Sequence, residues 1–226
     1  MWRRDLPIAL VLALIGLVLV WVLWGTLNGQ GAARLAELAL GRVPESGVSN
    51  PVTAVLLNFR AYDTLLELAV LLAAILGIWS TGPAVSGFLT AGPALQALTA
   101  LVVPLLVLSA GYLLWVGGYA PGGAFQAGAL LGAAGVILRL SGRSSAGLPP
   151  LPWLRLVVVL GVLVFASIGL GLMTLGADFL TFPPTGAKWL ILVIEAAATL
   201  SIGATLAAAY LSGEPLAATP PGGGKE

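Results

Sequence analysis

The side chains best able to do chemistry lie in residues 58–67, NFRAYDTLLE, where Arg60, Asp63 and Glu67 stand out in a chain with only 8% charged residues. On a helix, an advance of 100° per residue would place these three side chains within about 60° of one another. Asn58 would point to the opposite side. One helix face would then carry a guanidinium followed by two carboxylates one turn apart.

The run that follows is largely apolar and ends near Ser80, so a membrane span of about 20 residues would begin near Ala61. Asp63 would lie in the first turn, at the level of the lipid headgroups, and Glu67 would lie roughly 9 Å inside the start of the span. A charge well inside the hydrocarbon costs about 2.5–3.5 kcal/mol on insertion scales. This face must therefore meet protein, water or a counter-charge.

Two interpretations of these acids stay open. In the first, Arg60 and Asp63 pair to anchor a helix end, and Glu67 is covered by a neighbouring subunit. In the second, Glu67 lines a path for an ion or a proton, because ionisable groups inside membranes generally mark such paths. Asp63 would then be the entry ligand and Arg60 its counter-charge.

Composition limits the alternatives. The chain of 226 residues is 59% hydrophobic and has a mean hydropathy of +1.04, far above the range of water-soluble domains. It contains no Cys and no His, which excludes disulfides, Cys/His zinc sites, iron–sulfur ligation, His-ligated haem and a His general base. We therefore expect no cofactor, and most routes to a self-contained active site are removed. The net charge of +1 argues against nucleic acid as a partner.

Hydropathy predicts an all-α, polytopic integral membrane protein with about six transmembrane helices. The expected spans are residues 6–23, 61–80, 95–115, 125–140, 156–175 and 189–211. A short surface helix is expected within residues 31–40. The predicted domains are a two-helix unit with the charged stripe (1–82), a four-helix domain (83–212) and a disordered tail (213–226).

A glycine-rich turn, WVGGYAPGGAFQAG, connects the third and fourth expected spans at residues 115–128. Pro121 stops the helix before it, and Gly122 and Gly123 permit a tight turn. The turn lacks the Lys-Ser/Thr pair of a phosphate-binding loop, so we interpret it as a packing element. The small residues at the start of the next span, one turn apart, would let another helix approach closely. The residues assigned to this turn and helix are Pro121, Gly122, Gly123, Phe125, Gly128 and Gly132.

The last span contains a second acid, Glu195, with Lys188 and Thr199 on nearly the same helix face. Glu195 is either a carboxyl hydrogen-bonded across helices or a further group of the ion path, together with Lys188. Neither alternative is favoured by spacing alone.

Arginine placement sets the expected orientation. Arg139, Arg143 and Arg155 occur in a connection without acidic residues, which places that connection in the cytoplasm by the positive-inside rule. Counting spans back puts Arg3 and Arg4 on the same side. We therefore expect a multi-pass protein of the cytoplasmic membrane with both termini inside.

Two motifs resemble a known family. NFRAYDTLLELAVL is similar to a helix near the C-terminal end of the large A subunit of Mrp-type multisubunit sodium/proton antiporters, and to the equivalent small subunit of related membrane-bound hydrogenases. WVGGYAPGGAFQAGALLGA resembles the signature of the antiporter B subunit, and WLILVIEAAATLSIGATL resembles the end of that B domain. Together these matches extend over residues 48–211 in the family's order. The chain thus looks like an A-subunit tail fused to a B-type domain.

The sequence departs from the family pattern at three places. An acid usually occupies the position of Asn58, His-Asn usually lies near Gly118 and Tyr119, and Gly usually replaces Ala124. Only Arg60, Asp63 and Glu67 therefore carry over from the first motif, and no imidazole can act at the turn.

The resemblance implies a non-catalytic subunit of a cation/proton antiporter, with other membrane subunits, the lipid bilayer and sodium ions or protons as its partners. The only metal that it implies is a transient sodium ion at Asp63 and Glu67. Two alternatives stay open: an ion-translocating subunit in the membrane arm of a hydrogenase or other respiratory complex, and a purely structural subunit.

Overall fold

The computed structural model describes residues 2–28, 31–81, 92–143, 145–183 and 186–213. Across these residues the chain is helical and contains no strand, which confirms the predicted all-α class. The chain divides into two compact units, Met1–Arg42 and Val43–Glu226. The predicted boundary near residue 82 and the predicted disordered tail fall in 82–91 and 214–226, outside the described residues.

The first unit consists of α1 (Trp2–Asn28) and α2 (Gly31–Arg42). Its candidate membrane span is Leu10–Asn28, which overlaps the span expected from hydropathy. The surface helix expected over residues 31–40 corresponds to α2, two residues longer than the sequence pattern indicated.

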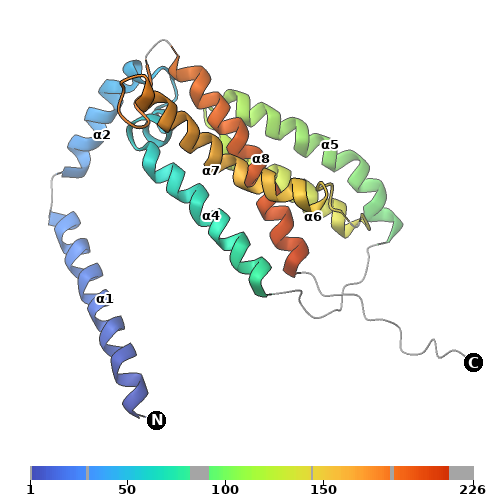
Figure 1. Cartoon of the computed structure of the whole chain (residues 1–226), viewed down its shortest axis with the longest axis horizontal. Coiled ribbons are helices and arrows are strands. Elements are labelled where there is room, and N and C mark those ends of the chain that lie inside the picture. The colour runs from blue at the N-terminus through green and yellow to red at the C-terminus, as the bar shows by residue number, and fades with distance from the viewer. Residues whose placement is uncertain (1, 29–30, 82–91, 144, 184–185, 214–226) are drawn as a thin grey trace, which may run out of the picture. The chain divides into compact units, whose positions relative to one another are not determined.

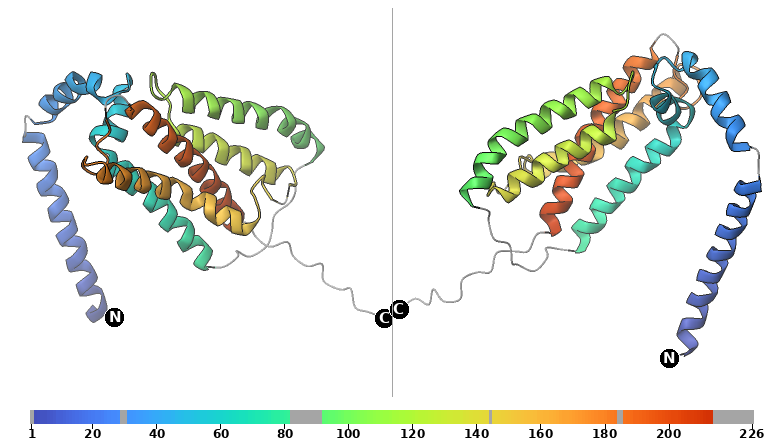
Figure 2. Two further views of the ribbon diagram at one scale, coloured as in Figure 1. Left: turned by 45° about the horizontal axis from the view of Figure 1, so that its top comes forward. Right: turned by 180° about the vertical axis from the view of Figure 1, so that it is seen from behind.

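The second unit begins with short helical turns and continues as a bundle of helices that run alternately up and down (Figures 1 and 2). Its elements are the 3₁₀ turn η1 (Val43–Ser46), α3 (Pro51–Ala54), the π-helical turn η2 (Val55–Phe59), α4 (Ala61–Thr81), α5 (Pro93–Val116), α6 (Ala124–Leu140), α7 (Leu151–Thr174) and α8 (Ala187–Gly213). Pro93 and Pro152 lie in the first turns of α5 and α7, where a missing N–H costs no helical hydrogen bond.

Among the described helices, α1, α4, α5, α7 and α8 are long and apolar enough to cross a membrane. The remaining segment predicted to span, residues 125–140, corresponds to α6, which is shorter at 17 residues. A helix of that length is about 25 Å long, close to the lower limit for a span. The polytopic class is therefore confirmed, and the orientation of the termini stays a prediction.

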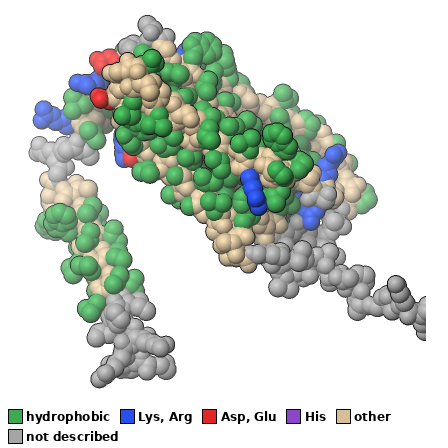
Figure 3. Space-filling model, viewed as in Figure 1, with side chains coloured by type: hydrophobic (Ala, Val, Ile, Leu, Met, Phe, Trp, Pro, Cys, Tyr) green, Lys and Arg blue, Asp and Glu red, His purple; other side chains and the backbone are tan. Residues whose placement is uncertain are grey.

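The last helix, α8, is the centre of the second unit. Within its most apolar window 67% of the residues are buried, against 28% or fewer for α4, α5 and α7. It packs against α4, α6 and α7, and Figure 1 shows it running between α7 and the α5–α6 pair. The outer surface seen in Figure 3 is dominated by hydrophobic side chains, as a lipid-facing surface requires.

Glycines bring α6 and α8 into close contact. A Cβ atom on Gly128 would lie 2.7 Å from the Ile202 side chain, and one on Gly132 would lie 2.8 Å from the Leu206 side chain. From the other side, a Cβ on Gly203 would meet the Leu131 side chain at 2.7 Å. The small-residue pattern predicted for close approach therefore lies against a helix of the same chain.

We expect Gly128→Ala to destabilise the bundle by about 1–3 kcal/mol, because the added methyl group overpacks a contact that neither backbone can relax. Unfolding of the purified protein in detergent measures this difference. Gly111→Ala is the matched control, since a Cβ at Gly111 in α5 meets nothing within 4 Å. Equal stability of the two variants would contradict the close α6–α8 contact.

Candidate functional site: an acid-lined cavity between α4, α6 and α8

The continuous helix expected across residues 58–67 is wrong, because the helix is interrupted at Arg60. The π-helical turn η2 ends at Phe59, Arg60 adopts φ −128° and ψ 36°, and α4 begins at Ala61. The wide turn is closed by the Arg60 N–H donating to the Val55 carbonyl at 2.8 Å. Asn58 and Arg60 therefore precede the helix that carries Asp63 and Glu67, and the predicted single stripe is two segments.

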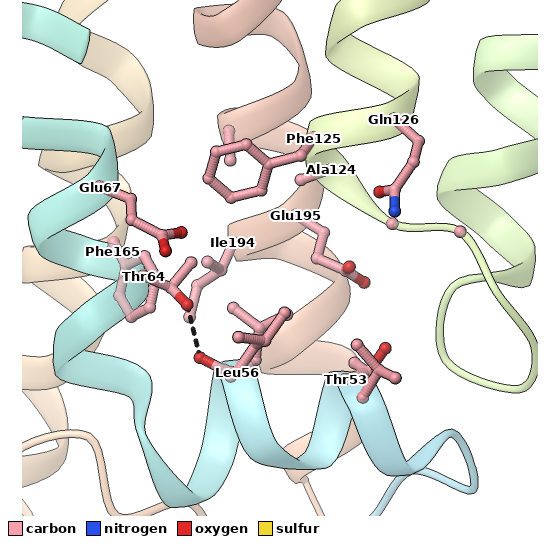
Figure 4. A pocket seen from close by; sticks show the side chains of 15 residues that line it. Thr53, Leu56, Thr64, Glu67, Ala124, Phe125, Gln126, Phe165, Ile194 and Glu195 are labelled. Atoms are coloured by element: carbon pink, nitrogen blue, oxygen red, sulfur yellow. Dashed lines mark hydrogen bonds between the residues drawn. The ribbon is translucent and has the colours of Figure 1, made fainter. Parts of the chain in front are cut away.

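The interruption is stabilised by a hydrogen bond between side chain and backbone. The Thr64 hydroxyl donates to the Leu56 carbonyl at 2.7 Å, across the break (Figure 4). π-type turns in helices occur frequently at functional sites, and irregular backbone at membrane depth is tolerated where it lines a cavity. The sequence gives no signal for this partnership, since the two residues are eight positions apart.

A second set of hydrogen bonds attaches the segment before the break to the glycine-rich turn. The buried Asn50 amide donates to the carbonyls of Gly117 at 2.8 Å and Ala120 at 2.9 Å. The Thr53 hydroxyl also donates to the Gly117 carbonyl, at 2.6 Å, and Asn58 donates to the Ser46 carbonyl at 3.0 Å. Asn58, where the family usually has an acid, is thus a structural residue in this chain.

The second acid, Glu195, is buried at 4% exposure and lies against the N-terminus of α6. The backbone of Ala124, the first residue of α6, is hydrogen-bonded to its carboxyl group. Gly123 precedes the helix with φ 108°, and a Cβ at this position would lie 2.7 Å from Glu195 Oε1. Unpaired N–H groups and the helix dipole favour a negative charge at this place. The turn interpreted as a packing element also forms the binding position for a carboxylate.

Glu67 and Glu195 open onto one cavity of about 260 Å³. In Figure 4 the Glu67 carboxylate extends from α4 into this space, and the Glu195 side chain extends from α8 toward the start of α6. The polar groups of the wall besides the two acids come from Thr53, Thr64 and Gln126. Apolar side chains, including Leu56, Phe125, Phe165 and Ile194, make up most of the remaining wall. A cavity of this size and polarity has room for several water molecules.

Arg60 and Asp63 lie outside this cavity, at an open groove that Glu67 also lines. They form an ion pair, and their side chains are 68% and 44% exposed. Val70, Phe125 and Ile202 are among the apolar residues of the groove. Glu67 therefore lies between the open groove and the cavity that it shares with Glu195.

Lys188 lies on the other side of Glu195. Its ammonium group is 4.9 Å from the centre of the Tyr119 ring and 5.6 Å from that of Trp189, within the range of cation–π attraction. Lys188 and Glu195 also line a small hollow of about 20 Å³ together with Tyr119. Four predicted residues thus line three adjoining hollows. Asp63 and Glu67 line the open groove, Glu67 and Glu195 line the cavity, and Glu195 and Lys188 line the small hollow.

Sequence reasoning missed three residues of the cavity wall. Thr53, Thr64 and Gln126 are isolated polar side chains in apolar surroundings, and that isolation is the signal that could have identified them. Within the described residues no group of three or more acidic side chains suits a resident metal ion. The transient sodium site at Asp63 and Glu67 stays a prediction.

The fold and the cavity define a class: an all-helical, polytopic membrane protein with two carboxylates that face one cavity. A family model described as "Domain related to MnhB subunit of Na+/H+ antiporter" matches residues 94–212. That range covers more than half of the chain, and the chain belongs to this family. It includes the glycine-rich turn and Glu195 but not Glu67.

Two solved structures share the fold. A chain in "Structure of Mrp complex from Dietzia sp. DQ12-45-1b" aligns with a TM-score of 0.67 and 24% identity, over 97% of this chain and 27% of that one. A chain in "Structure of the membrane-bound sulfane sulfur reductase (MBS), an archaeal respiratory membrane complex" aligns with a TM-score of 0.66 and 22% identity, over 93% and 97%. The chain spans about a quarter of the length of the Mrp chain it matches. None of the curated proteins compared with the chain matches it.

We expect Gly123→Ala to destabilise the protein and to displace Glu195, because the new Cβ would meet Oε1 and the residue would have to keep a positive φ. Gly142→Ala is the matched control: its φ is 100°, and a Cβ there meets nothing within 4 Å. Both variants carry the backbone strain of a non-glycine residue at positive φ, about 1–3 kcal/mol. Only Gly123→Ala should lose the hydrogen bond to a charged group as well, about 1.5–3 kcal/mol.

Unfolding in detergent measures the difference, and labelling of Glu195 by a hydrophobic carbodiimide reports its displacement. Equal unfolding and equal labelling in both variants would contradict the proximity of the turn to Glu195.

Proposed function

We propose that this chain is a non-catalytic subunit of a multisubunit cation/proton antiporter, and that its acid-lined cavity is part of the ion path. The observation that carries the proposal is the common cavity of Glu67 and Glu195, two carboxylates contributed by different helices. Membership of the MnhB-related family supports the class of complex. The fold shared with a chain of an Mrp complex is compatible with it.

The arrangement suits stepwise ion movement. A cation or proton arriving in the open groove would first meet the exposed Asp63, which the Arg60 guanidinium neutralises in part. It would pass to Glu67, which borders both the groove and the cavity. From there a proton could reach Glu195 through water and the polar side chains of the wall, since carboxylates and water exchange protons readily.

The same geometry allows exchange of one ion for another. A carboxylate that is reached from water and bordered by apolar walls can bind either a proton or a cation. Binding of one lowers its affinity for the other. Release of a proton from Glu67 would leave a negative charge that attracts sodium, and binding of sodium would oppose reprotonation. This competition is what antiport requires of a shared site.

A second candidate is an ion-translocating subunit in the membrane arm of a hydrogenase or other respiratory complex. The observation that favours it is the alignment over 97% of a chain of the membrane-bound sulfane sulfur reductase, an archaeal respiratory membrane complex. Ion exchange in vesicles without a redox substrate favours the antiporter. Exchange that requires an electron donor favours the respiratory complex.

We expect Glu67→Gln to reduce cation/proton exchange by about a hundredfold, the lower end of what a positioned proton-transfer group contributes. Glutamine keeps the shape of the side chain but can neither release a proton nor attract a cation. Exchange is measured in everted vesicles containing the complete complex, across a series of pH values. Recovery of the complex should be unchanged, because glutamine has nearly the same size and shape as glutamate.

Glu37→Gln is the matched control for charge, since Glu37 lies in α2 of the first unit and lines none of the cavities described here. Exchange by Glu67→Gln at the wild-type rate at every pH would show that the acids are an anchor and that the path lies in another subunit.

Asp63→Asn should reduce exchange only a few-fold, because Asp63 lies at the open groove, where bulk water can replace it as an entry ligand. The reduction should shrink as the salt concentration rises, since screening weakens the attraction between exposed charges and ions. Initial rates at low and high ionic strength test this. A loss as large as that of Glu67→Gln would contradict the order of the two acids.

A further inference from the structure

A second cavity, of about 360 Å³, lies between α5 and α6 near the start of α5 and the end of α6. It is remote from the acid pair, because even its nearest α5 residue, Pro104, is about 18 Å along the helix from the end of α5 at Val116, where the glycine-rich turn lies. Its wall is formed by Gln96, Thr99, Ala100, Val103 and Pro104 of α5 and by Leu138, Ser141 and Arg143 at the end of α6. None of these residues takes part in the proposed ion path.

The cavity wall carries a positive charge, which favours binding of an anion. Arg143 is the one charged residue of the wall, and no carboxylate among the described residues forms an ion pair with it. The surrounding connection, residues 139–155, contains further arginines and no acid. A guanidinium binds a carboxylate or a phosphate through two parallel hydrogen bonds, so a phosphate group is one anion that suits Arg143.

The α5 side of the wall carries polar groups that can form hydrogen bonds with a ligand bound to Arg143. Pro104 has no N–H, so the carbonyl of Ala100, one turn earlier, lacks its usual helical donor. The Gln96 amide can donate to a phosphate oxygen. The hydroxyls of Thr99 and Ser141 donate to the carbonyls of Leu95 and Leu138 within their own segments, both at distances below 3 Å. A ligand with a phosphate and a neighbouring hydroxyl or ammonium donor would satisfy both sides.

The position of the cavity indicates where such a ligand comes from. It lies at helix ends, the level at which lipid headgroups meet a transmembrane bundle. Along the same helix toward the membrane centre, α5 presents Leu101, Leu105 and Leu108 to the outside, with exposures of 64%, 52% and 69%. Acyl chains could lie along this apolar surface while the headgroup fills the cavity.

We propose that the cavity between α5 and α6 binds the phosphate of an anionic phospholipid headgroup, with Arg143 as its principal ligand. Basic cavities between transmembrane helices on the arginine-rich side of a membrane suit such headgroups. The site is separate from the ion path, and its occupation would hold α5 against α6.

Native mass spectrometry of the purified full chain with added phosphatidylglycerol tests the proposal. We expect one tightly bound lipid in the wild type. Arg143→Gln should weaken binding at least about tenfold, which corresponds to about 1.4 kcal/mol. Arg155→Gln, which removes the same charge from a residue of α7 outside this cavity, should leave binding unchanged.

Ala100→Leu supplies a second variant with unchanged charge. The larger side chain should fill the cavity and weaken binding even though Arg143 is intact, while the thermal stability of the lipid-free protein should stay near that of the wild type because Ala100 is exposed. Competition with inorganic phosphate distinguishes a lipid headgroup from free phosphate as the source of the bound phosphate group. Displacement of the lipid only by other phospholipids identifies the headgroup. Displacement by millimolar phosphate identifies free phosphate as the natural ligand. Equal lipid binding by Arg143→Gln and Arg155→Gln would overturn the proposal.

Discussion

The contact of the Glu195 carboxyl group with the start of α6 is the interaction on which the rest of the site depends. A carboxylate inside a membrane bundle needs donors, and the first N–H groups of a helix are donors without partners in their own helix. Gly123 permits this approach because it has no Cβ and adopts φ 108°. The position of α6 relative to α8 is fixed further along by Gly128 and Gly132, so the glycines of one segment both bind the acid and set the packing.

The broken helix before α4 follows from the same turn. Asn50 and Thr53 donate to the carbonyls of the turn, and this attachment holds the segment before the break beside the start of α6. The polypeptide then turns at Arg60 and enters α4, which places Glu67 across the cavity from Glu195. Two acids 128 positions apart in the sequence thus meet because each side of the cavity is hydrogen-bonded to one glycine-rich turn.

Hydropathy and proline placement were enough to predict the helices of the bundle, because each span must satisfy its own backbone hydrogen bonds and expose apolar side chains to lipid. They also identified Glu67, Asp63 and Glu195 as unusual. They could not predict the interruption at Arg60, since the Thr64–Leu56 hydrogen bond joins residues whose types give no sign of it. Nor could they place Glu67 and Glu195 in one cavity, because that depends on how α4 and α8 pack, which periodicity does not specify.

The central claim is that Glu67 and Glu195 act as one unit. A double-mutant cycle on cation/proton exchange, with Glu67→Gln, Glu195→Gln and the combined variant in the complete complex, tests this most directly. If the two carboxylates pass the same ion, the combined variant should be no slower than the slower single variant, because either substitution already interrupts the path. Reductions that multiply in the combined variant would show independent roles and would contradict the shared cavity as the route of the ion.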